Sequence, residues 1–117
     1  MKKAELTRQK FEEIVVEVLE RLPKRFKSRL QNVDVVIKDG SGRGKTLGLY
    51  EGVPLKDRTH DYGNVLPDKI TLYWRNIETE CREAGTDIRE EVRHTIEHEI
   101  AHHFGITDEH LEDSGIY

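Results

Sequence analysis

The chain has one cysteine, Cys81, and one methionine, Met1, among its 117 residues. A single cysteine excludes an internal disulfide and a zinc site built from several thiolates. No apolar run is long enough to span a membrane. The first residues carry charges at Lys2, Lys3 and Glu5, which is not the pattern of a signal peptide. We therefore expect a soluble cytoplasmic protein without a membrane partner.

The sequence also lacks a concentration of positive charge. Its formal net charge is −4, and its lysines and arginines are scattered along the chain. No basic face for nucleic acid is evident, so we expect no nucleic-acid partner. Hydrophobic residues make up 35% of the chain and charged residues 36%. This balance and length predict one domain over residues 1–117, with a modest core under an ion-rich surface.

Two helices are predicted from apolar residues spaced three and four apart. The first ends at Pro23, and its apolar stripe consists of Phe11, Ile14, Val15, Val18, Leu19 and Leu22. The second runs from Ile88 to Phe104 after a cap at Thr86 or Asp87, with Glu90 at the spacing of a capping box. Its expected core side consists of Ile88, Val92, Ile96, Ile100 and either His103 or Phe104.

Three runs rich in β-branched and aromatic residues predict strands at 33–37, 46–50 and 70–74. A short helix is expected at 76–83, where Gly85 ends it. The fold class is therefore α/β in the α+β sense. We expect a small mixed sheet of about three to four strands, packed on the N-terminal helix and on the long C-terminal helix.

The long helix contains the pattern H-E-x-x-H at His98, Glu99 and His102. Residues four apart lie one turn apart on a helix, so the two imidazoles can bind one ion from the same side. Glu99 is rotated by about 100° from His98, which suits contact with a water rather than with the ion. Zinc hydrolases use this arrangement, with two histidine ligands and the glutamate as general base.

Two residues that follow the motif strengthen this interpretation. Gly105 lies three residues after His102 and can end the helix in the left-handed conformation. Asp108 comes just past that turn, where a carboxylate can complete a His-His-Asp ligand set and leave one position open. His110 is a rival third ligand. The simpler interpretation is a solvated helix with a glycine cap and a second cap at Thr107 or Asp108, but it leaves the ligand spacing unexplained.

A second register overlaps the first. His94, Glu97 and His98 form the inverted pattern H-x-x-E-H, in which Glu97 would be the base. His94 and His102 stand roughly 12 Å apart along the helix axis, so one ion cannot bind all three histidines. We favour His98 and His102, because only this register is followed by the glycine and the aspartate. His94 then either donates a hydrogen bond near the reacting groups or bonds a backbone carbonyl.

Three segments resemble one family: 92–108, which contains the motif, 66–74 and 47–52. They resemble the minimal zincins, small bacterial proteins described as possible zinc metallopeptidases. The resemblance implies an α/β fold with a small mixed sheet and an active-site helix. Larger relatives place a methionine turn below the metal, whereas the only methionine here is Met1. The short chain also implies a shallow cleft.

The resemblance implies that zinc binds to the residues matching His98, His102 and Asp108, and it carries Glu99 over as general base. It further suggests that the strand around Ile70 to Tyr73 lies along the cleft and pairs with an extended substrate.

The leading hypothesis is a zinc-dependent metallopeptidase that acts on a peptide or protein, with Zn²⁺ as cofactor and Glu99 as general base. Candidates for stabilising the oxyanion are His94, Tyr62 and Tyr73. Two alternatives stay open: a metal-dependent hydrolase of RNA or another phosphodiester, and a non-catalytic module in which zinc ties the tail to the helix. Two histidines and a carboxylate also accept other divalent ions.

Overall fold

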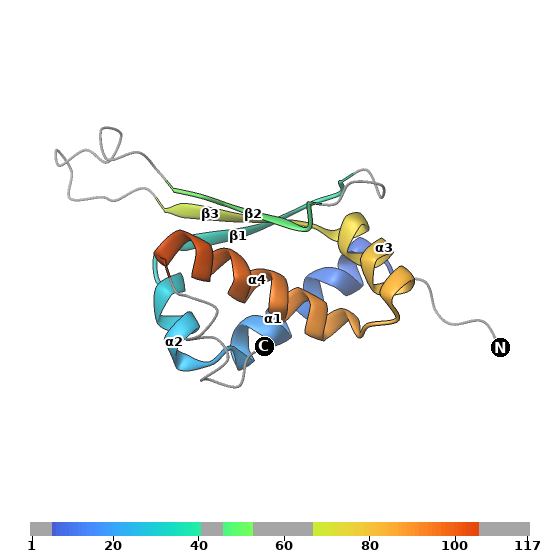
Figure 1. The fold of residues 1–117 in the computed structure, drawn as a ribbon, viewed down its shortest axis with the longest axis horizontal. Helices are drawn as coiled ribbons and strands as arrows, with labels where there is room; N and C mark the ends of the chain where they lie inside the picture. The colour runs from blue at the N-terminus through green and yellow to red at the C-terminus, as the bar shows by residue number, and fades with distance from the viewer. Residues whose placement is uncertain (1–5, 41–45, 53–66, 106–117) are drawn as a thin grey trace, which may run out of the picture.

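A computed structural model describes residues 6–40, 46–52 and 67–105. Its elements, in chain order, are α1 (Arg8–Arg21), α2 (Lys24–Lys27), the 3-10 turn η1 (Ser28–Leu30), β1 (Val33–Lys38), β2 (Gly48–Glu51), β3 (Asp68–Tyr73), α3 (Trp74–Ala84) and α4 (Ile88–Phe104). The strands form one layer, and α1 and α4 lie on one side of it (Figure 1). None of the helices in these ranges has the length and apolarity needed to cross a membrane.

The predicted first helix is confirmed as α1. The side chain of Thr7 caps it by accepting a hydrogen bond from the Lys10 N–H at 3.1 Å. Pro23 follows the last turn and opens the short helix α2. The apolar stripe of α1 is buried against the rest of the core, which is built from residues of α1, α2, β3, α3 and α4.

The sheet is mixed, as predicted, and its strand order is β1-β3-β2. Strand β1 pairs with β3 in parallel, and β2 pairs with β3 antiparallel. Because β3 has a neighbour on each side, both of its edges are already hydrogen-bonded. The expectation that the strand around Ile70 to Tyr73 pairs with substrate is therefore wrong. The edge strand beside α4 is β2.

The third strand ends one residue earlier than the sequence predicts, because Trp74 opens α3. The Trp74 indole N–H donates to Asp39 Oδ1 at 2.9 Å, and the Arg75 N–H donates to the Asp39 carbonyl at 3.0 Å. Asp39 directly follows β1, so these bonds turn the chain out of the sheet at the point where the β1–β3 pairing stops.

Helix α4 has the predicted bounds. The Asp87 side chain accepts hydrogen bonds from two backbone N–H groups of the first turn, and Gly105 ends the helix at φ 71°. The core side was predicted with one error. His103 and Phe104 are both exposed, and Ala101 is buried instead. The last turn of α4 passes the edge of the sheet, where His103 stacks on Tyr50 of β2 with ring centroids 3.9 Å apart.

Strand β2 lies very close to α4 because residue 48 is a glycine. A Cβ atom at Gly48 would stand 2.7 Å from Thr95 Cγ2 and 3.3 Å from the Thr71 carbonyl oxygen. The helix carrying the H-E-x-x-H motif is thereby held directly against the sheet edge.

Candidate metal centre and pocket

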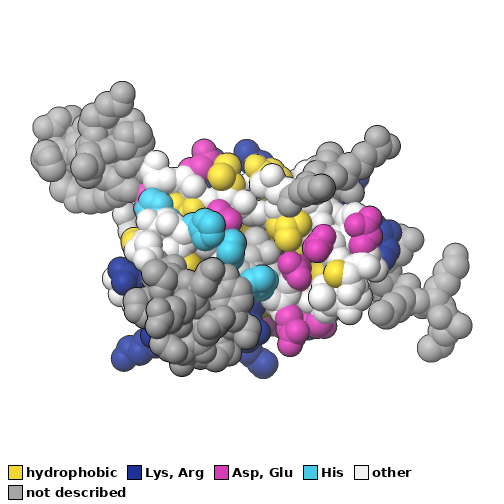
Figure 2. All heavy atoms as spheres, in the orientation of Figure 1, with side chains coloured by type: hydrophobic (Ala, Val, Ile, Leu, Met, Phe, Trp, Pro, Cys, Tyr) yellow, Lys and Arg dark blue, Asp and Glu magenta, His cyan; other side chains and the backbone are white. Residues whose placement is uncertain are grey.

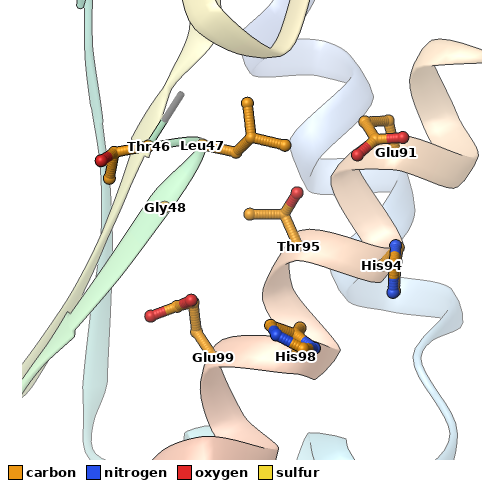
Figure 3. Close-up of a pocket in the computed structure, with 8 residues that line it drawn as sticks. All are labelled: Thr46, Leu47, Gly48, Glu91, His94, Thr95, His98 and Glu99. Atoms are coloured by element: carbon orange, nitrogen blue, oxygen red, sulfur yellow. The ribbon is translucent and has the colours of Figure 1, made fainter. Parts of the chain in front are cut away.

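A pocket of about 290 Å³ lies where β2 approaches α4 (Figure 3). One wall is formed by the segment that leads into β2, and the other by side chains of α4. Its lining residues are Thr46, Leu47, Gly48, Glu91, His94, Thr95, His98 and Glu99. Three of the motif residues discussed from the sequence, His94, His98 and Glu99, therefore face the same hollow.

The histidines of α4 form a row on one face of the molecule (Figure 2). The ring centroids of His98 and His102 are 4.3 Å apart, and those of His94 and His98 are 5.7 Å apart. His98 is half-buried at the pocket and His102 is exposed. Two imidazoles at this spacing suit a single divalent ion such as zinc.

The third ligand predicted from the sequence, Asp108, lies outside the described residues, as do its rival His110 and the oxyanion candidate Tyr62. In the part of the chain that the structure describes, no three acidic, histidine or cysteine side chains are gathered closely enough to hold a metal. Within the described ranges, His98 and His102 therefore have no third side chain of these types that would complete a metal site.

Glu99 points from α4 toward β2 (Figure 3). Its Oε1 accepts a hydrogen bond from the Tyr50 backbone N–H at 3.1 Å. This bond fixes the orientation of the carboxylate, which a general base needs in order to reach a water. The half-buried Glu99 is therefore anchored beside the pocket by the edge strand.

Glu97, the base of the inverted register, has a different environment. Its side chain is 1% exposed, it does not line the pocket, and neither carboxylate oxygen has a hydrogen-bond partner. The nearest cation is Arg93, whose Nε stands 3.7 Å from Oε1. Desolvation by burial raises the pKa of Glu97 to about 7. This position favours Glu99 over Glu97 as the acidic group of the site.

Sequence reasoning missed the residues that hold the wall of the pocket. Asn76 is buried in the first turns of α3, and its side-chain amide donates to the Thr46 carbonyl at 2.8 Å. At the other end of β2, the Tyr50 hydroxyl donates to Asp68 Oδ2 at 2.7 Å. The only sequence signal for Asn76 is a polar residue directly before the apolar Ile77, which does not reveal its partner.

Comparison with known proteins places this site in a family. No curated protein matches the chain. The sequence profile of the zincin-like metallopeptidases matches residues 30–116, a range that includes all three strands, the row of histidines and Asp108. The chain belongs to the zincin-like metallopeptidase family.

Proposed function

We propose that the protein is a zinc-dependent peptidase in which His98, His102 and Asp108 hold the ion and Glu99 is the general base. The observation that carries this proposal is the arrangement on α4. Two imidazoles stand 4.3 Å apart, and Glu99 lies on the neighbouring strip of the same helix, at a pocket beside the edge strand.

The ligand atoms that these residues offer fit zinc. Imidazole nitrogen atoms and a carboxylate oxygen are its ordinary ligands in hydrolases, and three protein ligands leave a position open. When bound, zinc supplies Lewis acidity, which polarises a carbonyl group and acidifies water.

Glu99 takes the proton of the attacking water and delivers it to the leaving amine. Its bond to the Tyr50 N–H holds the carboxylate at the pocket before substrate arrives. Of the oxyanion candidates, His94 lines the pocket and Tyr73 does not. We therefore assign His94 as the hydrogen-bond donor to the oxyanion.

An extended peptide fits the outer edge of β2. The Leu47 carbonyl accepts from the Tyr73 N–H at 3.0 Å, so the backbone groups of Leu47 face β3. Backbone groups alternate along a strand, which turns those of Gly48 and Tyr50 to the outer edge. The bond from Tyr50 to Glu99 agrees with this orientation. A peptide that adds here as a further strand can pair with the backbone of Gly48 while the Tyr50 N–H stays bonded to Glu99.

Metal content and peptide hydrolysis test the proposal in the same set of variants. We expect about one zinc per chain in the untagged wild type and its loss in His102→Ala. Glu99→Gln keeps the carbon skeleton and should retain zinc, while peptide hydrolysis falls by about 10²–10⁴-fold. Glu97→Gln is the matched control on the same helix and should retain hydrolysis.

Two results would contradict the proposal. Hydrolysis that survives Glu99→Gln would remove the assigned base. Zinc bound without hydrolysis of any peptide would leave a non-catalytic zinc module.

A further inference from the structure

We infer that Glu91 makes this pocket select a basic side chain, lysine or arginine, next to the scissile bond of the substrate. The inference rests on the proposed peptidase function and names a specificity that the motif itself does not contain.

The pocket extends along α4 from the motif toward the N-terminal end of the helix. Glu91 lines one end, and His98 and Glu99 line the other, with Thr95 between them (Figure 3). Seven residues separate Glu91 from His98, which corresponds to roughly 10 Å along the helix axis. A substrate carbonyl at the motif would thus place its neighbouring side chain toward Glu91. Only a long side chain covers most of that distance.

The pocket walls suit the stem of such a side chain. Leu47 stands opposite the helix, and the absence of a side chain at Gly48 keeps the space beside Thr95 open. Lysine and arginine bury their methylene groups against apolar surface while the charged end reaches a polar partner.

The charge at the end of the pocket is negative, and none of the lysines or arginines in the described ranges lines it. Glu91 is half-buried, and within the described residues it forms no ion pair. The neighbouring arginines of α4 are turned to other carboxylates. Arg89 Nε lies 2.8 Å from Glu17, and Arg93 Nε lies 3.7 Å from Glu97. Among the eight lining residues there is no lysine or arginine. An incoming cation would therefore meet a half-buried carboxylate that forms no ion pair within the described part of the chain.

A purely structural role for Glu91 is to complement the dipole of α4, because it lies in the first turn. Glu90 lies in the same turn and has the same relation to the dipole, but it lines a different cleft, with Glu17 and Arg21. Glu90 is therefore the matched control, since a lysine there perturbs the helix end in the same way without changing the pocket.

The test uses the zinc-loaded full chain and eight-residue quenched-fluorescent peptides. The peptides differ at one position, which carries Lys, Arg, Gln, Leu or Glu, and mass spectrometry identifies the bond that is cut. We expect kcat/KM for the Lys and Arg peptides to exceed that for Gln by about tenfold. Glu91→Gln should abolish this preference, Glu91→Lys should turn it toward the Glu peptide, and Glu90→Lys should leave it unchanged.

A binding assay separates this inference from the proposed chemistry. In the Glu99→Gln background, fluorescence anisotropy should show the Lys peptide binding about tenfold tighter than the Gln peptide, with the difference lost when Glu91→Gln is added. If no peptide is cut but this difference appears, the peptidase proposal fails and the basic selectivity stands. Equal binding of the two peptides, or a preference that persists in Glu91→Lys, overturns the assignment of Glu91.

Discussion

Glu97 and Glu99 are two residues apart on one helix but differ in burial and in hydrogen bonding. Glu99 is half-buried at the pocket and accepts a hydrogen bond from the edge strand. Glu97 is fully buried without any hydrogen bond. The H-E-x-x-H pattern and the inverted pattern each contain a glutamate, but only Glu99 places its carboxylate at the pocket.

We predict that Glu97 makes the stability of the protein fall as pH rises. Folding raises its pKa from the ordinary 4.5 to about 7, so the folded state binds this proton more tightly than the unfolded state. The stabilising contribution is complete below pH 4.5 and is lost progressively as the pH rises to about 7, where the loss reaches about 3 kcal/mol. Urea unfolding between pH 4.5 and 8, with a chelator present, should show this slope in the wild type.

Glu97→Gln is the variant that isolates the effect, because its side chain does not titrate. As the pH rises from 4.5 to 8, the unfolding free energy of the wild type should fall relative to that of Glu97→Gln. If the unfolding free energies of the two proteins change with pH in parallel, then folding does not raise the pKa of Glu97.

At the scale of single residues, helical spacing predicts which side chains of α4 lie together. His98 and His102 lie one turn apart with ring centroids 4.3 Å apart, and Glu99 lines the pocket beside them, while their roles as ligands and base stay predictions. Glu91 and Asn76 were not identified, because their roles depend on β2 and on the chain before it, which approach them from distant parts of the sequence. Helical periodicity cannot report such partners.

At the scale of elements, the contact between β2 and α4 positions the pocket. We predict that Gly48→Ala lowers the unfolding free energy by about 1–3 kcal/mol, because the added Cβ would lie 2.7 Å from Thr95 Cγ2. Thr95→Ser removes that methyl group and should restore part of the loss when combined with Gly48→Ala. Urea denaturation of both single variants and the double variant measures the coupling. If the loss in the double variant equals the sum of the losses in the two single variants, then residue 48 and the Thr95 methyl group are not in close contact.

The elements also show where sequence patterns stop being informative. Helix α4 was predicted with its bounds because capping residues mark both of its ends. The end of β3 was misplaced by one residue because Trp74 fits a strand by propensity, whereas its bond to Asp39 draws it into α3. The edge position of β2 was not predictable either, since strand order depends on how the whole sheet assembles.

At the scale of the whole molecule, zinc binding should stabilise the fold. Free zinc at about one hundred times its dissociation constant should add about 3 kcal/mol and raise Tm by roughly 10 °C. The shift should vanish with a chelator and in His98→Ala and His102→Ala, whereas His94→Ala should keep it. Calorimetry with and without zinc measures these shifts. Loss of the shift in His94→Ala together with its retention in His102→Ala would instead indicate the inverted register.

The contact between α1 and α4 has a consequence for the order of events during synthesis. The buried side chains of α1, such as Phe11 and Ile14, remain without part of their cover until α4 has left the ribosome. Because the same helix carries the histidines and Glu99, the core and the reactive site are completed together. A nascent chain that still lacks this helix has neither a closed core nor the row of histidines. The packing of α1 and the assembly of the pocket are thus one event in folding rather than two.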